Sequence, residues 1–272
     1  MIPGTGGATF QAFDYLDVSP SGLHWSLDAR SNSSSSFDSH VLVDGELVLR
    51  DSLSALPWNM AQVWQGGTSS VNDGGQIGVT SLGNSAIDYV VRGEQAGMGA
   101  WTVLETDTGG VSGVPGATYF SFASATITDD GRVGFVARVN GAASGADHIA
   151  RFDGQTIVEE WVTVPTGTVG GGPVRSIQHS RNTFTVSADG QHHAYRATVS
   201  NGLAWIVDGA ARVQSNQILP GSGYTREVSG VTGGRMDPSG TWFAWGLNEV
   251  DDRDWIVRDG VIIAEEFQPI VP

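Results

Sequence analysis

The chain has 272 residues, of which 38 are glycine and none is cysteine, and its 29 acidic and 14 basic residues give a formal net charge of −15. The absence of cysteine excludes disulfides, thiol catalysis and thiolate metal sites. The acidic balance disfavours nucleic acid as a partner, because the phosphate backbone would be repelled, and no apolar run is long enough to predict membrane insertion.

A unit of about 54 residues occurs five times along the chain. Each copy contains a short polar turn that ends in glycine, which supplies the positive φ that such turns need. The five glycines are Gly22, Gly75, Gly131, Gly190 and Gly240. Because these turns recur along the whole chain, the repeat decides the fold prediction.

Within each unit the elements follow one order. A first strand has an apolar residue four positions before the turn glycine, at Val18, Val71, Ile127, Val186 and Met236. A second strand begins after the turn with a small residue and a larger one, at 26–27, 78–79, 134–135, 194–195 and 244–245. A third strand runs into a second turn, which reads Asp-Gly in four units, and a fourth strand follows. Asp-Gly between apolar runs is a strong hairpin signal.

Four antiparallel strands, repeated five times with no helical stretch, predict an all-β fold, a five-bladed β-propeller. We expect a single domain over residues 1–272, with blades at about 8–52, 60–106, 118–160, 176–216 and 226–267. The small residue that opens the second strand would let neighbouring blades approach closely.

The two ends of the sequence match the two halves of one linker between blades. Residues 3–10 are similar to the linker segment at 115–120, and residues 264–267 match its first half. This favours a ring of five blades that is closed by packing of blade one on blade five. Asp17 and Arg235 occupy the same inner column of these two blades, so we predict an ion pair between them at the seam.

The turn and second strand of the unit resemble a known repeat. Residues 72–79 (NDGGQIGV) are similar to the NxxGxxAF tandem repeat of bacterial exported proteins, and residues 128–135 follow the same frame with threonine in place of asparagine. Residues 236–245 (MDPSGTWFAW) look like the repeat of Tol-associated periplasmic propellers. The resemblance implies export, to the extracellular space or the cell surface, and a propeller that acts as a binding scaffold. Residues 1–4 do not read as a signal peptide.

A column of aromatic and histidine residues opens the third strands. Its members are His40, Tyr89, His148, Trp205 and Trp255. Equivalent positions repeat around the axis of a propeller, so this column is a candidate binding site for sugar faces or other planar ligands. The alternative is a packing column that fills wedge-shaped gaps between blades.

Three acids of the first unit, Asp14, Asp17 and Asp28, have no evident role in turns. A glycoside hydrolase needs two carboxylates about 5–10 Å apart across the scissile bond, so these three are the candidate catalytic residues. No residue pattern predicts a metal site or a cofactor.

The sequence therefore leaves two functions open. The favoured one is a non-enzymatic binding or assembly propeller that holds a glycan or protein partner, as a homo-oligomer or part of a surface assembly. The alternative is a carbohydrate-active hydrolase that uses the inner-strand carboxylates.

Overall fold

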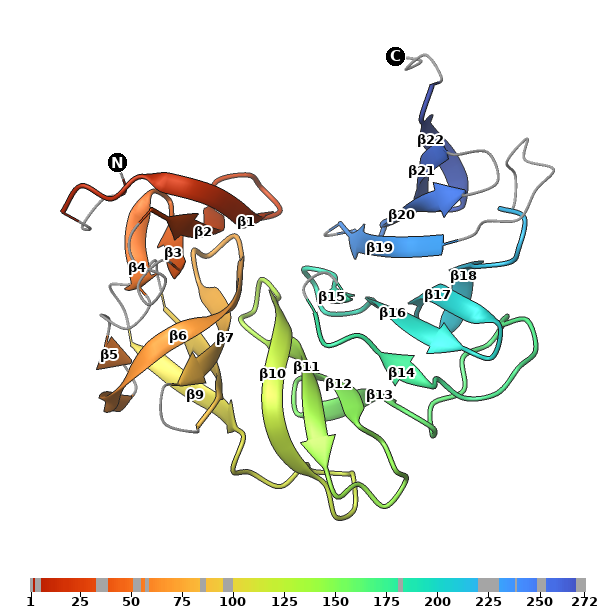
Figure 1. Cartoon of the computed structure of the whole chain (residues 1–272), viewed down its shortest axis with the longest axis horizontal. Helices are drawn as coiled ribbons and strands as arrows, with labels where there is room; N and C mark the ends of the chain where they lie inside the picture. Colours follow the sequence, from red (N-terminus) through yellow and green to blue (C-terminus); the bar gives the residue numbers. More distant parts are fainter. Residues whose placement is uncertain are drawn as a thin grey trace.

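The computed structural model describes residues 2, 6–32, 39–50, 55–56, 59–83, 87–94, 100–180, 183–219, 230–237, 239–248 and 253–267. These residues form 22 strands in five antiparallel sheets, which stand around a central axis as the blades of a propeller (Figure 1). The predicted all-β fold with five blades is confirmed. Within the described ranges no helix is long and apolar enough to span a bilayer.

Neighbouring strands of each sheet follow the chain order, and the four main strands of each blade run outward from the axis (Figure 1). Blade one contains β1 (Phe10–Val18), β2 (Trp25–Ser31), β3 (Ser39–Val43) and β4 (Glu46–Arg50). Blade two contains β5 (Ala55–Leu56), β6 (Asn59–Val71), β7 (Ile77–Gly83), β8 (Tyr89–Gly93) and β9 (Trp101–Thr106). The short β5 is paired to the start of β6, away from the axis. Blade three contains β10 (Thr118–Ile127), β11 (Val133–Asn140), β12 (His148–Phe152) and β13 (Gln155–Glu159).

The last two blades differ in their inner strands. Blade four divides its inner strand into β14 (Ser176–Ile177) and β15 (Phe184–Val186), which both pair with β16 (His193–Val199), followed by β17 (Gly202–Val207) and β18 (Ala210–Gln214). Blade five contains β19 (Gly230–Met236), β20 (Trp242–Asn248), β21 (Arg253–Arg258) and β22 (Val261–Glu265).

The two turns of each repeat adopt the conformations that their residues predict. The five glycines of the first turn have φ between 71° and 84°. In the second turn Asp44 and Gly45 lie at φ of 51° and 86°, and Asp153 and Gly154 at 50° and 72°. Two successive residues of positive φ make a type I′ hairpin, whose twist matches that of the strands.

Apolar side chains from both sheets fill the space between neighbouring blades. Between blades three and four, for example, Val136 and Ala150 on one sheet meet Phe184, Tyr195 and Ile206 on the other. Clusters of the same kind join blades one to two, two to three, and four to five. A single sheet cannot bury both of its faces, so the blades are stable because they stack side by side.

Close approach depends on the small residue that opens the second strand. A Cβ placed on Gly134 would lie 2.7 Å from Phe184 Cε1 and 2.8 Å from Thr126 Cγ2, closer than real contacts allow. Blades one, two and four place Ser26, Gly78 and Ala194 in this column, as the hairpin registers show. The expected packing role is therefore supported at four blades.

Blade five departs from this pattern. Phe243 pairs with Arg258 directly before the Asp259–Gly260 turn, so it is Phe243 that occupies the small-residue column. The expected member, Ala244, lies one position further and faces the other side of the sheet, towards blade four.

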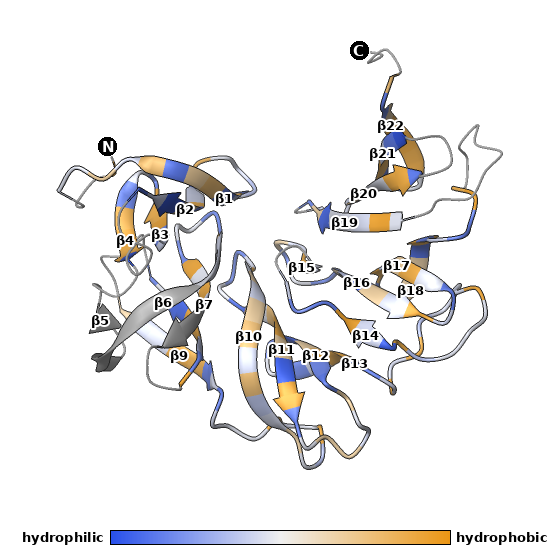
Figure 2. Ribbon diagram, viewed as in Figure 1, coloured by the Kyte–Doolittle hydropathy of each residue, from blue (hydrophilic) through white to orange (hydrophobic). Residues whose placement is uncertain are grey.

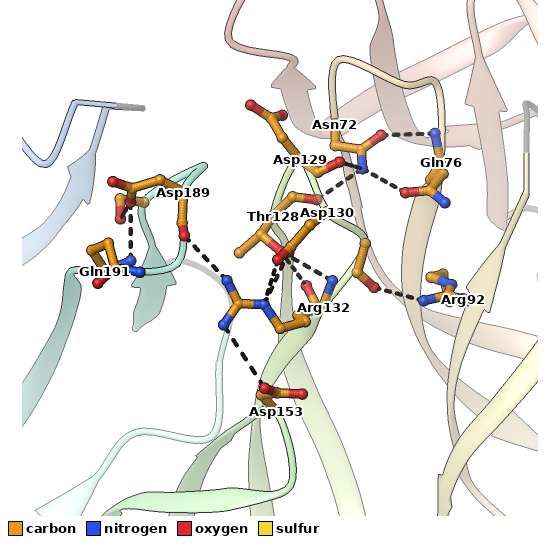
Figure 3. A network of polar contacts seen from close by, with 12 residues as sticks. Asn72, Gln76, Arg92, Thr128, Asp129, Asp130, Arg132, Asp153, Asp189 and Gln191 are labelled. Carbon is orange, nitrogen blue, oxygen red and sulfur yellow. Dashed lines mark hydrogen bonds and ion pairs between the residues drawn. The ribbon is translucent and has the colours of Figure 1, made fainter.

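Hydrogen bonds between turns tie successive blades together at one end of the axis (Figure 3). The buried Asn72 side chain donates to the Thr128 carbonyl at 2.8 Å, and its Oδ1 accepts from Gln76 N at 2.9 Å. Arg92 donates to the Gly131 carbonyl at 3.1 Å, and Arg132 donates to the Asp189 carbonyl at 3.1 Å. These bonds fix the turns of blades two, three and four relative to each other.

Blades one and five do not repeat this packing, and Figure 1 shows them standing apart. In the apolar column that precedes the first turn, Val18 of blade one is 50% exposed. The equivalent side chains of the other blades are between 3% and 9% exposed, namely Val71, Ile127, Val186 and Met236.

The facing sheet of blade five shows the same difference. Ile256 is 41% exposed, whereas the residues at its position in the other four blades are fully buried, namely Val41, Val90, Ala150 and Trp205. The packing that we expected between blades one and five is therefore not present, and both faces of the seam keep apolar surface in contact with solvent.

Candidate functional site

A cavity of about 520 Å³ opens at the turn end of the central axis and extends between blades one and five. One wall consists of Leu16, Val18 and Pro20 of blade one, and the other of Phe243, Trp245 and Ile256 of blade five. The inner end of the cavity is lined by residues of blades two to four, among them Ser70, Thr126 and Thr185. We call the whole cavity the seam cleft. Its size lies within the range of about 300–1,000 Å³ that is typical of ligand sites.

Several apolar strand ends surround the cleft. Figure 2 shows hydrophobic colour on β1 and β21, the strands that stand on its two sides. Monomeric proteins seldom expose contiguous apolar surface to solvent, and where they do, the surface often marks a binding site. The seam cleft is therefore the candidate functional site.

The floor of the cleft is an ion pair between blades one and five. The Arg235 guanidinium donates to Asp17 Oδ1 and to the Tyr15 hydroxyl, and it lies 5.2 Å from the centre of the Tyr15 ring. Burial acts to lower the pKa of Arg235, but the neighbouring Tyr15 and Asp17 outweigh it and raise the pKa above its ordinary value. The ion pair predicted from the sequence is confirmed.

Asp17 also joins blade one to blade two. Its side chain is buried, and Oδ2 accepts hydrogen bonds from Ser70 Oγ at 2.7 Å and from Val71 N at 3.0 Å. With Arg235 on the other oxygen, both carboxylate oxygens have partners. Asp17 therefore has a structural role at the place where the ring would close.

A second, much smaller cavity of about 20 Å³ adjoins the ion pair on the central axis. Hydroxyl groups line much of it, among them those of Thr68, Ser70, Ser124 and Thr185. That volume is enough for about one water molecule. This second cavity is too small for a ligand, whereas the seam cleft is large enough.

The three candidate catalytic acids lie in three different environments. Asp14 forms an ion pair with Arg30 at 3.1 Å on the surface of blade one. Asp28 is buried between blades one and two, where it accepts a hydrogen bond from Ser69 Oγ at 2.6 Å. Of the three, Asp17 alone borders the cleft.

A second carboxylate, Asp237, borders the cleft as well. It caps its own turn, because its Oδ1 accepts from Ser239 N at 2.9 Å and from Thr241 N at 3.0 Å. Burial acts to raise the pKa of Asp237, but these hydrogen bonds outweigh it and lower the pKa. A carboxyl group with a lowered pKa is ionised at neutral pH and does not serve as a general acid there.

The aromatic and histidine column does not form a common surface. His40, Tyr89, Trp205 and Trp255 are buried, and His148 is half-buried. The strand registers place His40, Tyr89 and Trp255 at equivalent positions but shift the other two members by one residue, which turns their side chains to the opposite face. None of the five lines the seam cleft. A role in ligand binding stays a prediction.

A polar cluster lies between blades three and four, and the sequence did not predict it. The buried Glu160 carboxylate accepts from His148 Nδ1 at 3.1 Å and from the backbone N–H of Asp147 and Ile177. Burial acts to raise the pKa of Glu160, but these partners outweigh it and lower the pKa. The ring of His179 lies 5.8 Å from that of His148, and burial lowers the pKa of His179. These groups are separated along the sequence, so no local pattern indicated the cluster.

The cleft residues of blade five were also missed, although one signal was present. Phe243 stands in a column that otherwise contains Ser26, Gly78, Gly134 and Ala194. A large aromatic residue there blocks the close approach that the other blades use. In the part of the chain that the structure describes, no group of three or more His, Asp or Glu side chains is placed to hold a metal ion.

Fold and site together define a five-bladed β-propeller with an open cleft between its first and last blades. The sequence matches no protein-family model, and no curated protein matches it. Among solved structures, TolB from Acinetobacter baumannii is similar in fold, with 12% identity, a TM-score of 0.50, and coverage of 92% of this chain and 53% of that chain. The chain thus spans about half the length of that protein.

Two further structures resemble the chain more weakly. A TolB-like protein of Agrobacterium tumefaciens has 11% identity and a TM-score of 0.45, with coverage of 93% of this chain and 81% of that chain. A gluconolactonase from Xanthomonas campestris has 14% identity and a TM-score of 0.39, with coverage of 94% and 86%. At these identities the likeness concerns the fold alone.

Proposed function

We propose that the protein is a non-enzymatic binding propeller that holds its partner, a protein or a glycan, in the seam cleft. The observation that carries the proposal is the exposure of Val18 and Ile256, whose equivalents are buried at every other interface between blades. Covering such residues removes apolar surface from water, which favours association. The net charge of −15 supports a partner other than nucleic acid.

We further propose that the protein is exported and acts at the cell surface or outside the cell. The resemblance of residues 72–79 to the NxxGxxAF repeat supports this, and so does the likeness in fold to TolB. A chain without cysteine is compatible with an oxidising environment, because it cannot form wrong disulfides.

A carbohydrate-active hydrolase has less support. Hydrolysis requires two carboxylates that face one substrate, and the candidate acids Asp14, Asp17 and Asp28 are distributed over an exposed ion pair, the cleft floor and a blade interface. This alternative would be restored if the wild-type protein hydrolysed a glycan and the variant Asp17→Asn, still folded, did not.

The binding proposal is tested with glycan and peptide arrays that are probed with the wild-type protein and two variants. Ile256→Asp places a charge in the cleft, and Ile263→Asp is the control, because Ile263 is 50% exposed on β22 but does not line the cleft. We expect wild-type binding to be lost in Ile256→Asp and retained in Ile263→Asp. Equal binding by all three proteins, or no binding at all, would refute the proposal.

A further inference from the structure

The cleft-facing side of blade five contains two arginines in one row. Arg235 on β19 pairs with Phe243 on β20, and Phe243 pairs with Arg258 on β21. Directly paired residues project from the same face of a sheet, about 5 Å apart, so the row reads Arg–Phe–Arg across the wall. The corresponding rows of the other blades contain at most one cation, with Asp17, Ser70, Thr126 and Thr185 at the inner position.

The two arginines differ in their availability. Arg235 is engaged by Asp17 and Tyr15. Arg258 is exposed, lies 5.9 Å from the centre of the Phe243 ring, and has no carboxylate partner within the described ranges. An exposed cation without a carboxylate partner, beside an apolar wall, favours a partner that brings a negative charge to this place.

The next row on the same face is apolar. Trp245 on β20 pairs with Ile256 on β21, and Ile256 lies two residues before Arg258. Residues two apart on a strand face the same side and are separated by about 6.5–7 Å. Ile256 and Trp245 therefore offer an apolar surface that lines the cleft opposite Leu16 and Val18 of blade one. Arg258 does not itself line the cavity; it lies beside the lining residue Phe243, at the repeat distance of an extended chain from Ile256.

We propose that the seam cleft binds an extended segment of a protein partner in which an apolar residue and an aspartate or glutamate are two positions apart. The apolar side chain packs on Ile256 and Trp245, and the carboxylate forms an ion pair with Arg258. Alternate side chains of an extended segment point to opposite sides, so the residue between them faces Val18. This inference rests on the proposed function and names the partner that the cleft would take.

The composition of the cleft favours a peptide over a glycan. Its two walls contribute Leu16, Val18, Pro20, Phe243, Trp245 and Ile256, all apolar or aromatic. A glycan needs converging polar groups to orient it. Of the polar groups in the lining, Asp17, Ser70 and Asp237 already have internal partners, and the Thr126 and Thr185 hydroxyls lie at the inner end of the cavity.

The test uses fluorescein-labelled octapeptides, acetylated and amidated at their ends, in which a leucine, a polar residue and an aspartate occupy successive positions and the remaining positions vary. Binding is measured by fluorescence polarisation at low ionic strength. A second set of peptides contains lysine in place of the aspartate. The proteins compared are the wild type, Arg258→Glu, Ile256→Asp and the control Arg212→Glu, since Arg212 is exposed on β18 away from the cleft.

We expect the wild type and Arg212→Glu to bind aspartate peptides, Ile256→Asp to lose them, and Arg258→Glu to bind them at least tenfold more weakly but to gain affinity for the lysine peptides. Peptide binding that Ile256→Asp abolishes and Arg258→Glu leaves unchanged would overturn the role of the acidic residue, while the binding function stands. Binding of glycans without any peptide would overturn the inference alone. Binding of neither would overturn both proposals.

Discussion

Removal of Asp17 tests how far the seam depends on one buried carboxylate. Asp17→Ala leaves the Ser70 hydroxyl and Val71 N without their acceptor, and it leaves the Arg235 guanidinium without its ion-pair partner. An unsatisfied buried donor costs about 1–3 kcal/mol, and breaking a buried ion pair costs about 3–5 kcal/mol. Because the Arg235 side chain is 40% exposed and can be partly hydrated, we expect a loss of about 3–4 kcal/mol.

The measurement is the free energy of unfolding in urea for the wild type, Asp17→Ala and the control Asp14→Ala. Asp14 belongs to the same strand and forms an ion pair with Arg30, but that pair is exposed, so its loss costs at most about 1 kcal/mol. The variant Arg235→Met measures the contribution of the seam ion pair alone, since it leaves the hydrogen bonds of Asp17 to Ser70 and Val71 of blade two intact. A difference below about 1 kcal/mol between Asp17→Ala and Asp14→Ala would refute the reasoning.

Three further predictions concern the other parts of the ring. Gly134→Val should destabilise the fold by at least about 1–3 kcal/mol, because a Cβ there would meet Phe184 at 2.7 Å; an unchanged melting temperature would contradict it. Asn72→Ala should cost about 2 kcal/mol, since the five hydrogen bonds of a buried amide are lost, and hydrogen exchange should increase at the turns of blades two and three. Burial lowers the pKa of His179 below 6.5, so its contribution to stability is present above pH 6.5 and is lost as the pH falls through the folded-state pKa; His179→Gln should flatten the decline in melting temperature between pH 7 and 5, and an unaltered pH profile would argue against this.

The turn and strand signals in the sequence were sufficient to predict the five blades. Asp44–Gly45 and Asp153–Gly154 each lie between two apolar runs, and both residues of each pair adopt a positive φ that few other residue pairs tolerate, so these pairs predicted the hairpins that the structure contains. The pairing of Asp17 with Arg235 was predictable as well, since both residues lie at a fixed offset from their turn glycines and the repeat places them in one column.

The aromatic and histidine column was misaligned on the third strands, because its members do not lie at one offset from the Asp-Gly turn that follows. His40 lies five residues before Gly45, whereas His148 lies six before Gly154 and Trp205 lies four before Gly209. A shift of one residue exchanges the two faces of a strand, which is why His148 and Trp205 do not share a face with His40. On the second strands the small-residue column lies three or four residues after the turn glycine, and this variable offset led to Ala244 in place of Phe243.

The sequence by itself determined the architecture of this protein, because turn geometry and strand alternation are set by neighbouring residues and recur in each of the five repeats. Only the tertiary structure decided the candidate site. Whether Val18 and Ile256 are buried depends on what stands opposite them, and nothing in their own strands distinguishes them from Val71 or Ala150. The seam cleft exists because blades one and five, more than 200 residues apart in the chain, meet through Arg235 and Asp17 without the close packing that joins every other pair of neighbouring blades.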